Sequence, residues 1–86
     1  MPENQKYRTY RINAGGLEFE VSIDRTGVLG DVNLNGLAIP VPSLKAIKVP
    51  DFFSGRDVTL EVALTSQALY NWDCDEHAEA LQAAQR

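Results

Sequence analysis

The chain has 86 residues, of which 44% are hydrophobic and 23% are charged. This length is enough for one hydrophobic core, and the composition is typical of a globular domain rather than a disordered chain. No apolar run approaches the ~18 residues of a membrane-spanning helix, which argues against a membrane protein. We therefore expect a single domain over residues 1–86, with residues 1–5 as a disordered tail.

The net charge of −4 is unevenly distributed. Residues 57–86 hold six acidic side chains and a single basic one, Arg86. A nucleic-acid-binding protein usually shows the opposite, a basic stripe, so direct contact with nucleic acid is not expected. A single cysteine, Cys74, cannot form an internal disulfide, and the N-terminal segment lacks the apolar core of a signal peptide. Both features predict a cytoplasmic location.

The first hairpin is predicted over the segments RTYRINA and LEFEVSID, which flank Gly15-Gly16. Two glycines form an accepted hairpin loop, and both segments alternate apolar and polar residues. The loop sets the register, which places Arg11 opposite Glu20 and turns the apolar residues of both strands to one face. The predicted pairs are Ala14 with Leu17, Ile12 with Phe19, Tyr10 with Val21, and Arg8 with Ile23.

Two further turns continue the meander. In the segment DRTG at 24–27, a four-residue loop pairs Ile23 with Val28. A three-residue loop instead turns Val28 outward unless a bulge at Gly27 corrects it. Asn35-Gly36 between apolar segments predicts a type I′ hairpin turn. The third strand is then predicted to present four residues inward, namely Val28, Gly30, Val32 and Leu34.

The fourth strand contains Pro40 and Pro42, although proline normally argues against a strand. The turn at Asn35-Gly36 directs the N–H groups of Leu37 and every second residue after it toward the third strand. Both prolines fall on the opposite side, where no donor is needed if nothing pairs there. The fourth strand is therefore predicted to be an edge strand over residues 40–42.

The remainder of the chain predicts an α+β fold. Residues 44–49 fit either a short strand or a helical turn, 50–55 fit a loop, and 56–65 alternate as a strand does. A C-terminal helix is predicted from Asp73, because Glu76 three residues later completes a capping-box pattern. The predicted architecture is an antiparallel β-meander of five to six strands, partly curled or a half-barrel, followed by one C-terminal helix.

The densest polar cluster is the segment DCDEH at 73–77. Cys74 and His77 are three residues apart and could share a helix face. A structural zinc site needs about four ligands, and no other Cys or His is present to supply them. No serine is placed beside His77 by a catalytic motif, and no glycine-rich phosphate loop occurs. We therefore predict no metal, no cofactor and no enzymatic activity.

The aromatic residues near the acidic segment are the candidate binding residues. Phe52 and Phe53 are adjacent in a loop, where they either plug the open end of the sheet or protrude toward a protein partner. Tyr70 and Trp72 precede the acidic segment, and Trp72 fits a connector between helix and sheet. The predicted protein-binding residues are Phe52, Phe53, Tyr70, Trp72, Asp73, Asp75, Glu76 and Glu79.

These residues predict a non-enzymatic interaction module that binds and blocks a partner protein with a basic surface. Small acidic inhibitors of phages and mobile elements, including anti-CRISPR proteins, have a comparable size and charge, which is an analogy and not a family resemblance. One alternative is a structural or accessory subunit that forms a homo-oligomer through its sheet. A second alternative is a small hydrolase or metal protein that uses His77.

Overall fold

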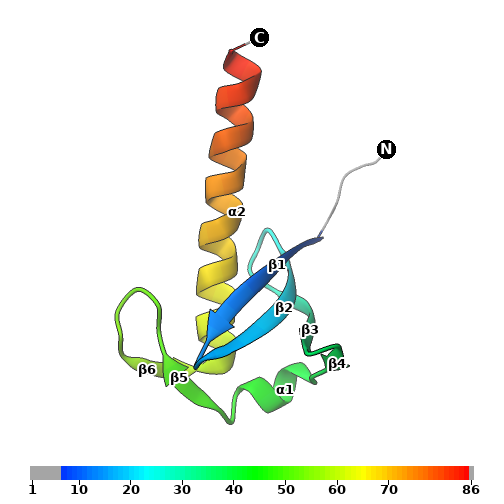
Figure 1. Cartoon of the computed structure of the whole chain (residues 1–86), viewed down its shortest axis with the longest axis vertical. Helices are drawn as coiled ribbons and strands as arrows, with labels where there is room; N and C mark the ends of the chain where they lie inside the picture. The colour runs from blue at the N-terminus through cyan, green and yellow to red at the C-terminus, as the bar shows by residue number, and fades with distance from the viewer. Residues whose placement is uncertain (1–6, 86) are drawn as a thin grey trace.

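A computed structural model describes residues 7–85, so the predicted tail at 1–5 lies outside the described residues. The described chain forms an open four-stranded antiparallel sheet in the order β1-β2-β3-β4, a two-stranded sheet β5-β6, and two helices. The long helix α2 follows the strands and crosses one face of the larger sheet (Figure 1). The predicted α+β class is therefore confirmed, and the meander is divided into two sheets.

The first hairpin has the predicted register. β1 (Tyr7–Ala14) and β2 (Leu17–Asp24) pair with Ala14 opposite Leu17 and Arg11 opposite Glu20. Both glycines of the loop have a positive φ, 59° at Gly15 and 81° at Gly16, as a type I′ turn requires. A Cβ atom added to Gly15 would lie 2.9 Å from a methyl carbon of Val49, so the turn also lets β5 approach closely.

β3 (Leu29–Leu34) pairs with β2 through a bulge, so the predicted pairing of Ile23 with Val28 is wrong. Val21 pairs with Val32 and Ile23 pairs with Leu29, so two steps along β2 match three steps along β3. The extra residue lies in β3. On the Leu29 side of the bulge, it exchanges the positions that face inward with those that face outward. Leu29 is consequently half-buried against the core while Val28 is exposed, so the predicted inward positions of Val28 and Gly30 are wrong.

β4 (Leu37–Ala38) is the short edge strand of this sheet. The turn before it is of the predicted type, with φ of 54° at Asn35 and 81° at Gly36. The Ile39 N–H donates to the Val32 carbonyl at 2.8 Å, in the predicted direction.

The prediction that the fourth strand continues through the prolines is wrong. Pro40 is the N-cap of the short helix α1 (Val41–Leu44), and Pro42 lies in its first turn. The first turn of a helix tolerates proline because its N–H groups have no partner within the helix. The two prolines therefore begin a helix, and the edge ends at Ala38.

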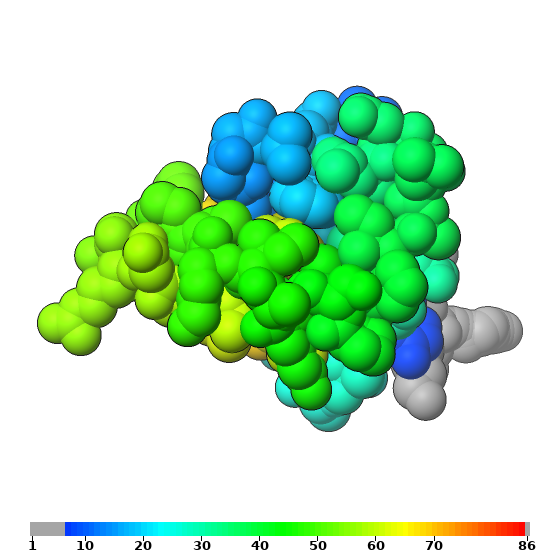
Figure 2. All heavy atoms as spheres, turned by 90° about the horizontal axis from the view of Figure 1, so that it is seen from below, coloured from blue at the N-terminus to red at the C-terminus, as the bar shows by residue number. Residues whose placement is uncertain are grey.

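The segment that the sequence left open, 44–49, contains parts of both alternatives. α1 ends at Leu44, which is buried, and β5 (Lys48–Pro50) buries Val49. β5 pairs with β6 (Asp57–Thr59), and the loop between them projects from the body of the protein (Figures 1 and 2).

α2 (Leu60–Ala84) begins thirteen residues earlier than predicted and replaces most of the strand predicted over 56–65. The side chain of Thr59 caps it by accepting from the Val62 N–H at 3.3 Å. The predicted cap at Asp73 is therefore wrong, because the helix runs through it. The buried residues have helical spacing and are Leu60, Ala63, Leu64, Ala68 and Trp72.

The core lies between one face of the larger sheet and the first half of α2. The sheet contributes mainly Ile12, Phe19, Val21, Ile23 and Val32. From Asp73 to Gln85 all residues of the helix except Glu76 are exposed, so this half extends beyond the sheet (Figure 1). Within residues 7–85, no helix is both long and apolar enough to cross a membrane.

Candidate protein-interaction surface

Three aromatic rings meet on the surface beside α2, and we call Phe52, Phe53 and Tyr70 the aromatic cluster. Their exposed fractions are 69%, 52% and 51%. The Phe53 ring makes edge-on contacts with Phe52 at 5.1 Å and with Tyr70 at 5.3 Å between ring centroids. Neither phenylalanine plugs the end of the sheet, which answers the question that the sequence left open.

The loop that carries the two phenylalanines is organised by Asp51. Its Oδ2 atom accepts from the N–H groups of Phe53 at 3.2 Å and Ser54 at 2.9 Å. Its backbone N–H and carbonyl bond to Arg56 and Gly55, each at 2.8 Å. These bonds close the loop on itself, so the phenylalanines are presented by a folded turn.

Trp72 lies apart from this cluster and is 5% exposed. Its indole N–H donates to Glu76 Oε2 at 3.0 Å. The guanidinium carbons of Arg8 and Arg25 lie 5.1 Å and 5.8 Å from the ring centroid, which places a cation near the ring from two strand ends. Trp72 thus connects α2 to the sheet, and its ring is not presented to a partner.

Three of the four acidic side chains that were predicted to bind a partner form ion pairs within the chain. Arg25 pairs with Asp73 at 3.7 Å and with Glu76, and Arg8 pairs with Glu79 at 3.3 Å. Exposed ion pairs of this kind contribute about 0–1 kcal/mol each to stability, so they orient the helix more than they stabilise it. The four carboxylates still outnumber the two arginines, which leaves this face acidic.

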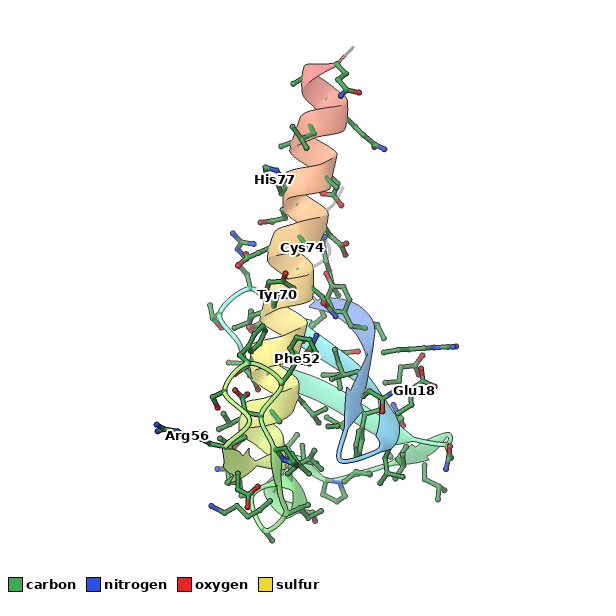
Figure 3. All side chains as sticks on the ribbon, turned by 60° about the vertical axis from the view of Figure 1, so that its left-hand side comes forward. Glu18, Phe52, Arg56, Tyr70, Cys74 and His77 are labelled. Atoms are coloured by element: carbon green, nitrogen blue, oxygen red, sulfur yellow. The ribbon has the colours of Figure 1, made fainter. Side chains whose placement is uncertain are left out.

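Tyr70, Cys74 and His77 are exposed and follow one another along α2 (Figure 3). Hydrogen bonding to the Cys74 thiol, one turn further on, raises the pKa of Tyr70. Among residues 7–85, no group of three or more His, Cys, Asp or Glu side chains is arranged to hold a metal ion.

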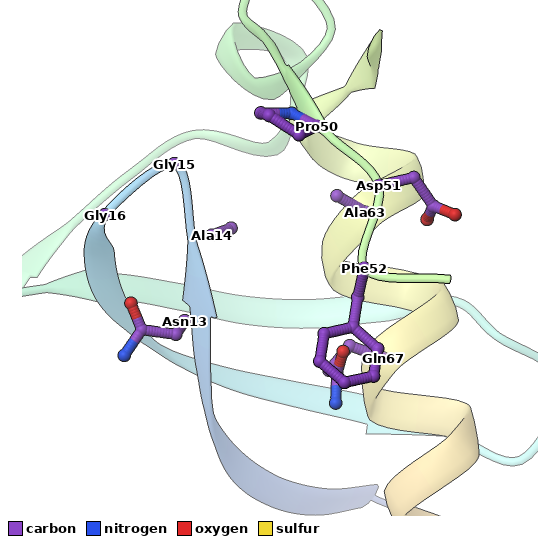
Figure 4. Close-up of a pocket in the computed structure, with 9 residues that line it drawn as sticks. All are labelled: Asn13, Ala14, Gly15, Gly16, Pro50, Asp51, Phe52, Ala63 and Gln67. Carbon is purple, nitrogen blue, oxygen red and sulfur yellow. The ribbon is translucent and has the colours of Figure 1, made fainter. Parts of the chain in front are cut away.

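Two of the hollows in the structure lie along β1, and no local sequence pattern predicts either. The first, the Gln67 hollow, has a volume of about 370 Å³ and lies between the Gly15-Gly16 turn, the start of the Phe52 loop and α2 (Figure 4). The second, the Tyr10 hollow, has a volume of about 380 Å³ and is lined by residues 7–10 and Asp75. Both depend on how α2 crosses the sheet, which local sequence patterns do not determine.

The Gln67 hollow has a buried polar atom, Gln67 Oε1, without a hydrogen-bond partner among the described residues. In the Tyr10 hollow, burial is the largest influence on the pKa of the Tyr10 hydroxyl and raises it, while the neighbouring Arg8 guanidinium lowers it and the Asp75 carboxylate raises it. Buried polar groups are nearly always hydrogen-bonded in folded proteins, so Gln67 Oε1 marks a place where a bound donor would be stabilised.

Comparisons with protein-family models, with curated proteins and with solved structures found no match to this chain. The sequence predicted the three rings of the aromatic cluster as binding residues, and the structure brings these rings together. It separates Trp72 from them and adds two hollows along β1.

Proposed function

We propose that this protein is a non-enzymatic interaction module that binds a partner protein through the aromatic cluster and blocks the covered surface of that partner. The observation that supports this function is the contact among three exposed aromatic rings. Large apolar side chains scattered singly over a surface are normal, whereas a contiguous exposed group is typical of a binding site. Aromatic side chains are also frequent among the residues that contribute most binding energy.

The charge of the neighbouring helix supports a partner with a basic surface. Asp73, Asp75, Glu76 and Glu79 lie on the part of α2 that extends beyond the sheet. An acidic surface speeds association with a basic partner and disfavours acidic ones. The exposed thiol of Cys74 is compatible with a reducing compartment, and we place the interaction in the cytoplasm.

The test compares two exposed hydrophobic residues. The wild-type protein, Phe53→Ala and Leu37→Ala are used to capture partners from the native host, and affinities for the captured protein are then measured after purification. Leu37 is the matched control, because it is exposed on β4 rather than in the aromatic cluster. We expect Phe53→Ala to weaken binding by about 30-fold or more, as loss of a hot-spot residue does, and Leu37→Ala to leave it unchanged.

Charge reversal at Asp75 tests the electrostatic part. Asp75→Lys is expected to slow association and to reduce its dependence on salt, with a smaller change in dissociation. Equal binding by wild-type protein and Phe53→Ala would contradict the proposed surface. Light scattering that shows a symmetric oligomer, retained by Phe53→Ala, would favour the alternative of a homo-oligomeric subunit.

A further inference from the structure

The outer edge of β1 has the properties of a strand-binding site. β1 is the outermost strand of the larger sheet, and its eight residues pair with β2 without a bulge. It contains no proline, and the opposite edge strand, β4, has two residues only. A long regular edge presents a row of unpaired N–H and C=O groups to which another strand can bond.

The hairpin register identifies which backbone groups are available. Residues on either side of a two-residue loop form a hydrogen-bonded pair, so the N–H and C=O groups of Ala14 point toward β2. Because this direction alternates along a strand, the corresponding groups of Thr9, Arg11 and Asn13 point away from β2. Within residues 7–85, these groups form no backbone hydrogen bond to another segment.

The two hollows lie along this same edge. Asn13 and Ala14 line the Gln67 hollow, and Thr9 and Tyr10 line the Tyr10 hollow. Side chains on neighbouring strands share a face when they lie opposite each other, so residues opposite Tyr10 and Ala14 would point toward α2. These two positions are four residues apart, which is about 13 Å along a strand. An added strand would thus place two side chains, four positions apart, at the two hollows.

We infer that the partner contributes an extended segment that adds to β1 as a further antiparallel strand and fills both hollows. This inference rests on the proposed function and names how the partner is bound. The buried Gln67 Oε1 atom supports it, because this oxygen needs a donor and has no partner among the described residues. A hydrogen bond from a partner segment would remove the free-energy cost of leaving that oxygen unpaired.

The lining of the hollows specifies the chemistry of that segment. The residue opposite Ala14 carries a side-chain amide that donates to Gln67 Oε1. The residue opposite Ile12 is apolar, because Ile12 belongs to the core. The residue opposite Tyr10 carries a basic side chain, because Asp75 lines that hollow. Main-chain bonds supply affinity and these alternate side chains supply specificity, as in other cases of strand addition.

A synthetic heptapeptide with this pattern, Thr-Gln-Thr-Val-Thr-Lys-Thr, is the probe. In the antiparallel register its third, fifth and seventh N–H groups point to β1. The matched control is the same peptide methylated on the third and fifth backbone nitrogens, which keeps every side chain and removes two donors. Amide chemical shifts of the isotope-labelled protein report binding. We expect saturable shifts at Thr9, Arg11 and Asn13, and at least tenfold weaker binding of the methylated peptide.

Variants of the protein test the same backbone hydrogen bonds by changing β1 instead of the peptide. Arg11→Pro removes an N–H that faces outward and leaves the pairing with β2 intact, whereas Arg11→Thr removes the side chain only. We expect Arg11→Pro to weaken peptide binding at least tenfold and Arg11→Thr to change it less than about twofold. Fluorescence of Trp72 verifies folding, and Thr9→Pro replaces Arg11→Pro if the latter is unfolded.

The outcomes separate this inference from the proposed function. Absence of peptide-induced shifts in β1 at millimolar concentration overturns strand addition, as does equal binding of the methylated peptide. A captured partner that is lost on Phe53→Ala and retained on Arg11→Pro leaves the proposed function standing and overturns strand addition. A dimer that Arg11→Pro dissociates would show that a second copy occupies the edge, which also overturns the inference.

Discussion

The side chain of Asp24 organises the turn between β2 and β3. Its Oδ1 atom accepts from the Thr26 hydroxyl at 2.7 Å and from the N–H groups of Thr26 and Val28, each at 2.9 Å. The hydrogen bond from the Thr26 hydroxyl is the largest cause that lowers the pKa of Asp24 below its ordinary value of 3.8, and the Val28 N–H comes next. The carboxylate therefore holds the turn that leads into the bulged strand.

This lowered pKa predicts a pH dependence of stability. The charged form is favoured in the folded state, so its contribution is present above pH 3.8 and is lost as the pH falls through the lower folded value. We expect Asp24→Asn to lower the melting temperature at pH 7, and the difference from wild type to narrow below pH about 4. Thermal unfolding of both proteins between pH 2 and 7 measures this difference in melting temperature.

The control for that experiment is Asp31→Asn. Asp31 is exposed on β3 and makes no hydrogen bond through its side chain to the residues that the structure describes. Its substitution is expected to leave the melting temperature nearly unchanged across the same pH range. A constant difference between Asp24→Asn and wild type down to pH 2 would be incompatible with the role assigned to Asp24.

At the scale of elements, the first hairpin was predictable and α2 was not. In β1 and β2, the glycine turn, the alternation of apolar residues and the pairing of Arg11 with Glu20 all agree on one register. Across β6 and the start of α2, apolar residues alternate as in a strand at Val58, Leu60, Val62 and Leu64, yet Val62 is exposed. Ala63 and Ala68 are buried together with Leu60, Leu64 and Trp72, and this spacing is that of one face of a helix.

The two halves of α2 are expected to differ in their contribution to stability. Leu64 is fully buried and Leu81 is exposed. Leu64→Ala leaves a cavity and should lower the free energy of unfolding by about 2–5 kcal/mol. Leu81→Ala makes the same chemical change and should alter it by about 0.5 kcal/mol or less. Urea unfolding followed by Trp72 fluorescence measures both, and similar losses would mean that the second half is packed in solution.

Only part of the candidate interaction surface was predictable, because the position of α2 on the sheet was not. Phe52, Phe53 and Tyr70 are conspicuous in the sequence because aromatic residues flank a loop and an acidic segment. Their contact, and the burial of Trp72 between two arginines, follow from the angle at which α2 crosses the sheet. The hollows beside β1 arise from the same crossing, and no local pattern encodes it.

At the scale of the whole molecule, the protein is a small packed body with a helix that extends beyond it (Figure 1). The last contact of that helix with the body, among the described residues, is the ion pair of Glu79 with Arg8. Residues 80–85 are exposed. The fold therefore depends on the helix as far as Glu79 and not on the segment after it.

Truncation tests this division. A chain that ends after Glu79 should remain folded, with a melting temperature within a few degrees of wild type, because no buried side chain is lost. A chain that ends after Leu69 loses Trp72 and both arginine contacts and should unfold at a much lower temperature. Calorimetry of both proteins distinguishes them. Unfolding of the longer variant would show that the exposed segment takes part in the fold.

The position of α2 in the chain also has a consequence for how the protein is made. The sheet residues Ile12, Phe19 and Val21 are covered by a helix that begins at Leu60, so the ribosome completes their strands well before it completes their cover. During that interval the nascent sheet exposes an apolar face and the open edge of β1. Slow translation between residues 35 and 60 would lengthen this exposure, and aggregation during synthesis would then depend on translation speed.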